Sequence, residues 1–195
     1  MKNFIGLLKT GLTAVIIIGL LKVTGLMGDV SYLTQTVAMK AGVLDVSPVS
    51  ETKAEPKFDY AFTIKDLYGN KLSFEKYKGK VIFLNLWATW CGPCKAEMPG
   101  IHNLYIKMKG EPIEFVMLSI DKDKAISKVE SYVKNNSYTF PVFMPSGYLA
   151  EQLQVPSIPT TFVISKEGLI VMKEVGTRNY DTKKMMEFLK KQAAK

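Results

Sequence analysis

Residues 81–94, VIFLNLWATWCGPC, combine an apolar run with a closely spaced pair of cysteines. The first seven residues are strand formers with one polar residue among them, which predicts a central strand covered on both faces. A helix is predicted to follow at once, because apolar residues recur at intervals of three or four between residues 98 and 108. The cysteines Cys91 and Cys94 therefore stand where a buried strand gives way to a helix.

The rest of the chain from Phe58 onward alternates strand-like and helix-like segments. Beside the central strand, the pattern predicts strands at 62–65, 71–74, 113–120, 138–143, 161–164 and 170–175, helices at 121–136 and 182–193, and a helical turn at 148–154. A βαβ beginning followed by a ββα ending predicts an α/β fold, with a mixed sheet flanked by helices on both faces. The first half is expected to pair in parallel through right-handed crossovers.

The composition is that of one folded domain with an attached segment. The 195 residues are 47% hydrophobic, which permits a sizeable core. The net charge of +8 is spread along the chain and Arg178 is the only arginine, which argues against nucleic-acid binding. Two cysteines are too few for a disulfide scaffold and cannot alone close a structural zinc site.

Residues 1–28 are predicted to be a membrane-targeting segment. Thr10 to Leu21 is a run of twelve residues without a charge. This length lies between that of a signal-peptide core, about 7 to 15 residues, and that of a spanning helix, about 20. A transmembrane or signal-anchor helix and a cleaved signal peptide therefore both remain open, and both send the rest of the chain across a membrane.

The flanking lysines predict the orientation of this segment. Lys2 and Lys9 precede the apolar run, so the positive-inside rule places the N-terminus in the cytoplasm and the folded domain on the periplasmic, extracytoplasmic side of the cell membrane. Residues 23–25 are the candidate cleavage site, but Lys22 lies just before them. An uncleaved anchor is therefore the preferred interpretation.

Residues 29–57 are predicted to connect the anchor to the domain. Apolar residues spaced three or four apart predict an amphipathic helix: Val30, Leu33, Val37, Ala41 and Leu44. The apolar face of this helix could rest either on the bilayer surface or on the folded domain, and the sequence leaves both open. Residues 47–57 are polar and contain two prolines, which is typical of an extended linker. The predicted organisation is thus an anchor at 1–28, a helix and linker at 29–57, and a domain at 58–195.

The spacing of the cysteines predicts redox chemistry. Backbone N–H groups and the positive dipole end at a helix N-terminus stabilise a thiolate on Cys91, and Pro93 suits the first helical turn. Cys94 is close enough to form a disulfide with Cys91. A purely structural disulfide across so short a loop would stabilise little. A copper-binding chaperone, with His102 as a third ligand, is an alternative.

The segment WATWCGPCKAEMP, residues 87–99, resembles the TlpA/ResA-like family of membrane-anchored, thioredoxin-fold thiol-disulfide oxidoreductases. A second motif agrees, because Ile158-Pro159-Thr160 matches the cis-proline of that family. The likeness covers about residues 58–195 and implies a thioredoxin-like domain. It implies no metal and no cofactor beyond a redox-active Cys91–Cys94 disulfide.

The resemblance also implies roles for individual residues. Cys91 resembles the attacking thiolate, Cys94 the resolving cysteine, and Glu97 the acidic residue near the pair. Pro159 keeps the Ile158 backbone available to a substrate chain. The predicted substrate-binding residues are Trp90, Gly92, Pro93, Ile158 and Thr160. Cytoplasmic thioredoxin carries a buried acid at the place of Asn85, so a proton-shuttle role would pass to Glu97 or to water.

Together these features predict a disulfide reductase for exported proteins, recharged by a membrane dithiol donor. The Gly-Pro pair between the cysteines is that of thioredoxin, whose potential of about −270 mV is reducing. A peroxiredoxin-like peroxide reductase is the nearest enzymatic alternative. It would place Thr where this chain has Ala88, and an arginine against the thiolate, whereas Arg178 lies far along the sequence.

Overall fold

The computed structural model describes residues 27–46 and 57–195. The predicted anchor, apart from its last two residues, and the predicted linker, apart from Lys57, lie outside these ranges. Within them, no helix is both long enough and apolar enough to cross a bilayer.

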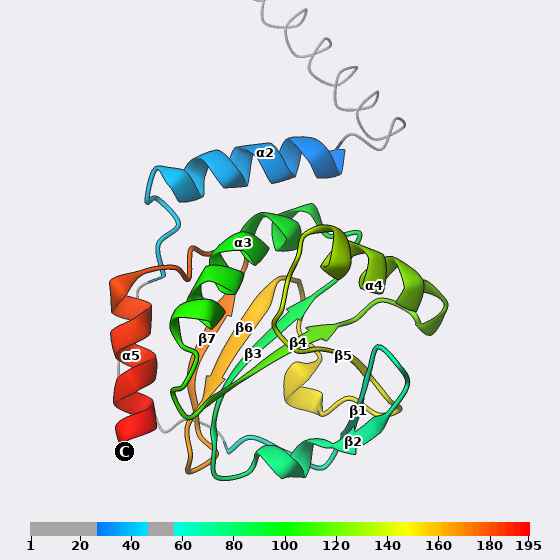
Figure 1. Ribbon diagram of the computed structural model, residues 1–195, viewed down its shortest axis with the longest axis vertical. Coiled ribbons are helices and arrows are strands. Elements are labelled where there is room, and N and C mark those ends of the chain that lie inside the picture. Colours follow the sequence, from blue (N-terminus) through cyan, green and yellow to red (C-terminus); the bar gives the residue numbers. More distant parts are fainter. Residues whose placement is uncertain (1–26, 47–56) are drawn as a thin grey trace, which may run out of the picture.

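A mixed β-sheet forms the centre of the domain (Figure 1). Its strands are β1 (Thr63–Asp66), β2 (Lys71–Ser73), β3 (Val81–Trp87), β4 (Ile113–Ser119), β5 (Val142–Pro145), β6 (Thr160–Ile164) and β7 (Ile170–Val175). They lie in the order β2-β1-β5-β4-β3-β6-β7. β3 pairs in parallel with β4, and β4 with β5, while β6 and β7 continue the sheet antiparallel on the other side of β3. The predicted βαβ and ββα halves are confirmed.

Four α-helices and three short 3-10 helices accompany the described part of the sheet. They are α2 (Met27–Lys40), α3 (Gly92–Lys107), α4 (Ile126–Asn135), α5 (Lys183–Ala194), η1 (Phe74–Tyr77), η2 (Asp123–Ala125) and η3 (Glu151–Leu153). Thr182 ends the loop before α5, where its hydroxyl accepts a hydrogen bond from the Met185 N–H and so caps the helix.

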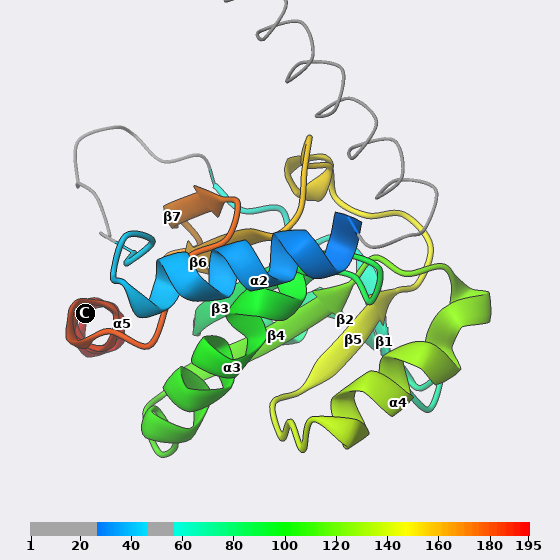
Figure 2. The same cartoon turned by 90° about the horizontal axis from the view of Figure 1, so that it is seen from above.

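The alternating side chains of β3 feed two separate cores. Phe83 and Trp87 belong to the core that α3, α4 and α5 cover. Ile82, Leu84 and Leu86 belong to the opposite core, where residues of η1, η3 and the segment 58–62 replace α-helices. The thioredoxin-like sheet with flanking helices is confirmed, but the α-helices of the domain share one face, where we expected them on both (Figure 2).

Two elements between β4 and β6 differ from their predicted bounds. The helix predicted from Asp121 begins as an α-helix only at Ile126, after the 3-10 helix η2, and the Asp121 carboxylate instead binds Thr89. The strand predicted over 138–143 is displaced to β5. Tyr138 and Phe140 instead stack against one another and meet the His102 ring edge to face, so they belong to an aromatic cluster beside the sheet.

A helix, α2, lies where the amphipathic helix was predicted, but it ends at Lys40, before Ala41 and Leu44, and it packs along α3. The residues after it are clasped to the loop before α5. The Asn179 N–H donates to the Leu44 carbonyl at 2.8 Å, the Val46 N–H donates to the Asn179 carbonyl at 3.1 Å, and the Asn179 amide reaches the Asp45 carboxylate at 2.7 Å. Because Val46 is buried in the core under α3 and α5, this clasp fixes the end of α2 on the domain.

Candidate active site

The cysteine pair lies at the N-terminal end of α3, directly after β3. Cys91 is the N-cap residue, and its sulfur accepts a hydrogen bond from the Cys94 N–H at 3.1 Å. The two sulfurs form a disulfide with a Cα–Cα distance of 5.2 Å. Cys94 is fully buried, whereas Cys91 retains 5% of its surface exposed. An incoming group therefore reaches the sulfur of Cys91 before that of Cys94.

The proline motif meets the cysteines from the other half of the fold. The Ile158–Pro159 peptide is cis, and the Ile158 carbonyl oxygen lies 3.8 Å from the sulfur of Cys91. The Gly176 N–H donates to the Pro159 carbonyl at 2.8 Å, which ties this loop to the end of β7. Trp90, on the other side of Cys91 in the sequence, exposes 66% of its surface. Residues 67 positions apart thus form one surface around Cys91.

Glu97 is buried three residues after Cys94, one helical turn along α3. Its carboxyl accepts hydrogen bonds from the Asn85 side-chain amide at 2.7 Å and from the Arg178 backbone N–H at 3.2 Å. Burial raises the pKa of Glu97 to about 8, against the opposing effect of these two donors and of the Arg178 charge. Glu97 is therefore mostly protonated at neutral pH, whereas an exposed glutamate would be ionised.

Asn85 can serve Glu97 in either protonation state. Its amide nitrogen also donates to the Thr161 hydroxyl at 2.9 Å, and its amide oxygen has no hydrogen-bond partner among the described residues. An amide offers a donor to a carboxylate and, after turning over, an acceptor to a carboxylic acid. A buried aspartate at this place would offer only acceptors when ionised. An asparagine at residue 85 thus suits a neighbouring carboxyl, that of Glu97, which gains and loses a proton.

Asp121 holds the segment that leads into the cysteine pair. Its carboxylate accepts from the Thr89 N–H at 2.8 Å, from the Thr89 hydroxyl at 2.7 Å and from the Ser119 hydroxyl at 2.7 Å. Asp121 follows β4, the parallel neighbour of β3, so its side chain meets the residues that follow β3. The loop before Cys91 is consequently fixed to the sheet rather than to α3 alone.

Helix α2 reaches the rim of the site through Thr177. The Thr177 hydroxyl lies 3.2 Å from the Pro93 carbonyl oxygen and is hydrogen-bonded to the Gln35 side-chain oxygen on α2. Thr177 comes directly after Gly176, which holds the cis-proline loop. The cysteine helix, the proline loop and α2 therefore share one contact point.

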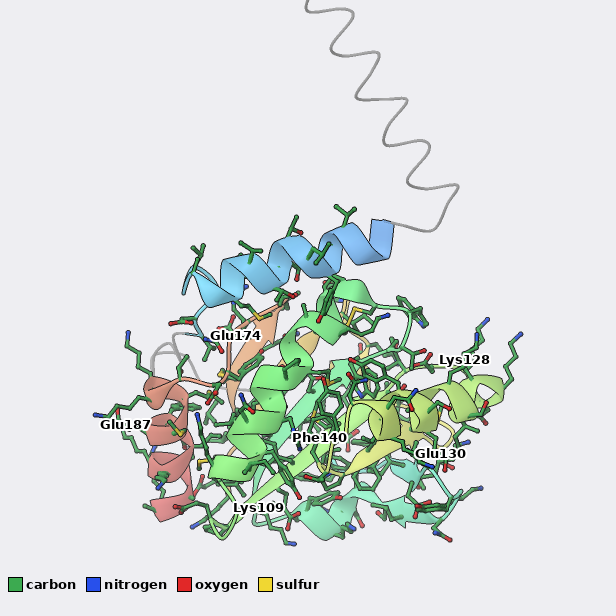
Figure 3. The ribbon with its side chains drawn as sticks, turned by 45° about the horizontal axis from the view of Figure 1, so that its top comes forward. Lys109, Lys128, Glu130, Phe140, Glu174 and Glu187 are labelled. Carbon is green, nitrogen blue, oxygen red and sulfur yellow. A yellow bond between two sulfur atoms is a disulfide. The ribbon has the colours of Figure 1, made fainter. Side chains whose placement is uncertain are left out.

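His102 lies apart from the cysteines. It is eight residues beyond Cys94 on α3, which corresponds to about 12 Å along the helix axis. Its Nε2 accepts the Thr139 N–H at 3.2 Å, and its ring stands among Tyr138, Phe140 and Tyr105; Figure 3 shows Phe140 between α3 and α4. Burial lowers the pKa of His102. In the part of the chain that the structure describes, no three acidic, cysteine or histidine side chains are grouped to hold a metal ion.

The structure brings together every residue singled out in the two motifs. Cys91, Cys94 and Glu97 lie on the first turns of α3, and the 158–160 segment faces them from the start of β6. Sequence reasoning missed Asp121, Thr161, Thr177 and the Arg178 backbone N–H. A polar residue at the carboxyl end of β4, beside β3, was the available signal for Asp121, whereas the others come from chain segments that only the fold brings near.

Fold and site together define a thioredoxin-fold protein with a redox-active disulfide at a helix N-terminus. Residues 57–173 match the AhpC/TSA family, and the chain belongs to that family. The thiol-disulfide oxidoreductase ResA of Bacillus thuringiensis subsp. konkukian is 36% identical over 131 residues, which are 67% of this chain and 73% of the relative. ResA of Bacillus subtilis is 34% identical over 117 residues, 60% of this chain and 64% of the relative.

Solved structures agree with these relatives. StoA from Bacillus subtilis superposes with a TM-score of 0.54 at 27% identity, covering 70% of this chain and 98% of its own. A thiol:disulfide interchange protein from Chlorobium tepidum gives 0.56 at 26% identity, covering 74% and 100%. The resemblance to ResA-like proteins is confirmed, and the chain is a thiol-disulfide oxidoreductase with Cys91 and Cys94 as its disulfide.

Glu97 makes the stability of the oxidised protein depend on pH. A carboxyl whose pKa rises from 4.5 unfolded to about 8 folded contributes stability that is fully present below pH 4.5 and is lost as the pH rises to 8. We expect Glu97→Gln to remove a slope of at most about 1.4 kcal/mol per pH unit across this window. Urea unfolding at several pH values measures it. Glu187→Gln on the exposed side of α5 should keep the slope; equal slopes in both variants would refute the role of Glu97.

Removal of the Asp121 carboxylate should destabilise the loop before the cysteines. Asp121→Ala leaves the N–H and hydroxyl of Thr89 and the Ser119 hydroxyl without their acceptor, and we expect a loss of about 2 kcal/mol or more in the free energy of unfolding. Asp123→Ala is the matched control, because it removes only an ion pair of an exposed carboxylate with Lys65 and should cost less than about 1 kcal/mol. Equal losses in the two variants would contradict the assignment.

Proposed function

We propose that this oxidoreductase works as a reductant of disulfides in exported proteins, with Cys91 as the nucleophile and Cys94 as the resolving cysteine. The observation that carries the proposal is the placement of Cys91. Its sulfur caps α3, accepts the Cys94 N–H at 3.1 Å and lies 3.8 Å from the Ile158 carbonyl in the proline loop. The same helix end that binds this sulfur in the disulfide would bind its negative charge in the dithiol.

The reaction proceeds by two exchanges of sulfur bonds. The Cys91 thiolate attacks one sulfur of a substrate disulfide, that disulfide breaks, and the other substrate sulfur leaves as a thiolate that takes up a proton. Cys94 then loses its proton and attacks Cys91, which closes the Cys91–Cys94 disulfide and releases the second substrate thiol. The substrate gains two electrons and two protons; the protein supplies both electrons and the proton of Cys94, and solvent supplies the other proton because Cys91 reacts as a thiolate.

Glu97 is proposed to exchange the proton of Cys94. Its pKa of about 8 is close to that of an ordinary thiol, about 8.5, so a proton passes between the two groups at little cost in free energy. Cys94 is fully buried and has no exposed surface from which water could take the proton directly. The network of Asn85 and the Arg178 N–H holds the carboxyl in place for both states.

The substrate chain is proposed to dock on the surface between Trp90 and the proline loop. Trp90 offers an exposed ring beside Cys91, and Pro159 presents the Ile158 backbone next to the sulfur. Gly92 and Pro93 place no bulky polar group over the first turn of α3. Thr160 is buried and donates to the Ser157 carbonyl at 2.8 Å, so its contribution is to shape the loop from within.

The reducing direction follows from the residues between the cysteines. Gly92 and Pro93 add no charge that would stabilise the dithiol further, whereas strong oxidants stabilise their reduced form. With residues 1–28 as a membrane anchor, the domain lies outside the cytoplasm, where disulfides form and persist. Recharging the protein then requires electrons from a dithiol donor in the membrane.

The site gives less support to the two alternatives. Ala88 is fully buried where a peroxide reductase would place a threonine, and the Arg178 guanidinium pairs with the Glu174 carboxylate and the Thr177 carbonyl. Copper binding by three ligands would need His102 next to the sulfurs, about two helical turns from its place. Oxidation of the dithiol by peroxide at catalytic rates would revive the first alternative.

Cys94→Ala should accumulate a mixed disulfide. The variant lets Cys91 attack a substrate disulfide but removes the group that resolves the intermediate. We therefore expect a mixed disulfide between Cys91 and a cysteine of an exported protein, and likewise with insulin. Non-reducing electrophoresis followed by mass spectrometry identifies the complex. Cys91→Ala is the matched control and should neither trap a partner nor reduce insulin disulfides. Full insulin reduction by Cys91→Ala would disprove the mechanism.

His102→Ala should leave the affinity of the reduced protein for Cu(I) within about twofold of the parent. The imidazole is bound to Thr139 and lies too far along α3 to join two thiolates. Competition with a chromophoric Cu(I) chelator measures the affinity. Stoichiometric Cu(I) binding that disappears in this variant would favour the copper chaperone instead.

A further inference from the structure

Helix α2 carries an apolar stripe that the domain does not cover. Val30, Leu33 and Val37 recur at intervals of three and four residues and expose 43%, 60% and 66% of their surfaces. From residue 30 to residue 39 the sequence contains no charged side chain. Side chains project from the outer side of α2, away from the sheet and from α3 (Figure 3). A helix whose outer face meets only water normally carries polar residues on that face, not aliphatic ones.

The opposite side of α2 is already occupied. Gln35 bonds to Thr177 at the rim of the site, and Ala38 and Met39 are half-buried toward the domain. At its far end, the clasp between residues 44–46 and Asn179 holds the chain. Rotating α2 to bury the stripe against the domain would break these contacts. The stripe therefore faces outward while α2 stays attached to the active-site end of the domain.

The sequence before α2 limits how far the stripe lies from the predicted membrane anchor. The uncharged run ends at Leu21 and α2 begins at Met27, so five residues separate them. Fully extended, the chain from Leu21 to Met27 spans about 20 Å. The helix itself is 14 residues long, or about 21 Å. If the anchor lies in the bilayer, the start of α2 is held within one helix length of the bilayer surface.

We propose that α2 lies flat on the lipid bilayer through Val30, Leu33 and Val37, and so holds the Cys91–Cys94 end of the domain next to the membrane. This inference rests on the anchoring of residues 1–28 proposed above. Three aliphatic side chains would bind a bilayer weakly by themselves, but a tether of five residues makes their insertion an intramolecular step at high effective concentration. The neutral stripe would enter the apolar boundary without burying a charge.

This arrangement assigns a purpose to the contact between α2 and the site. Thr177 contacts both the Gln35 side chain and the Pro93 carbonyl, so the surface helix and the cysteine helix meet at one hydroxyl. The disulfide would then face a dithiol donor embedded in the same membrane at a fixed height. Substrates would be proteins close to the bilayer, while the β1–β2 end of the domain points away from it (Figure 1).

Tryptophan quenching in vesicles tests the proposal. The full chain and its Leu33→Trp and Val37→Trp variants are reconstituted into phosphatidylcholine and phosphatidylglycerol vesicles, with and without bromine on the acyl chains. Bromine quenches only indoles that reach the apolar boundary. After subtraction of the parent signal from the native Trp87 and Trp90, we expect brominated lipid to lower the emission of both introduced tryptophans at least twofold. Both positions are exposed, so the substitutions leave the core intact.

Tyr68→Trp is the matched control, because Tyr68 is exposed in the β1–β2 turn at the opposite end of the domain and should show no quenching. A chain that floats with the vesicles, but whose tryptophans at 33 and 37 are quenched no more than that at 68, overturns the proposal and leaves a protein, such as a second copy, as the partner of the stripe. A chain that does not float overturns both this inference and the anchor on which it rests. Insulin reduction by the same preparations reports the proposed redox function separately.

Discussion

The hydrogen bond from the Cys94 N–H to the sulfur of Cys91, at the first turn of α3, is the contact around which the active site is arranged. It requires a strand that ends just before the cysteines, and the fully buried β3 supplies one. It requires a fixed loop between strand and helix, which Asp121 holds through Thr89. It also requires a surface opposite the sulfur, which the cis Ile158–Pro159 peptide provides. Each of these elements gains its function from its position around one sulfur atom.

The buried carboxyl of Glu97 links stability to chemistry. Taking the ionised carboxylate out of water costs more free energy than taking the neutral acid, which is why the pKa of Glu97 rises to about 8. The Asn85 amide and the Arg178 N–H offset part of this cost and keep the group oriented. A more polar pocket would make the protein more stable at neutral pH, but it would lower the pKa of Glu97 below the range in which it can exchange a proton with a thiol. The folded protein is therefore less stable at neutral pH than it would be with a neutral side chain at residue 97. In return, the raised pKa of Glu97 suits the proposed proton transfer.

The sequence predicts much of this fold, because β3 and the cysteine spacing carry local signals that need no tertiary information. The β6–β7 hairpin and α5 are equally local, since turn residues and periodicity define them. The strand β5 was displaced because Tyr138 and Phe140 are drawn into an aromatic cluster with His102, a tertiary effect. The roles of Thr177 and Arg178 could not be predicted, since a side-chain hydroxyl reaches Pro93 and a backbone N–H reaches Glu97 from about 80 residues away. The direction of the apolar stripe on α2 was likewise undecided, because its period gives a face but not what that face meets.

The ionisation of Cys91 in the reduced Cys94→Ala variant is the most direct test of the central claim. The rate of alkylation of the single thiol as a function of pH, or the ultraviolet absorbance of its thiolate, measures this ionisation. We predict that half of the Cys91 thiol is ionised at or below about pH 7.5, as for thiols at helix N-termini. A thiol that ionises only near about pH 8.5, as in an unstructured peptide, would contradict the claim that the start of α3 activates this sulfur.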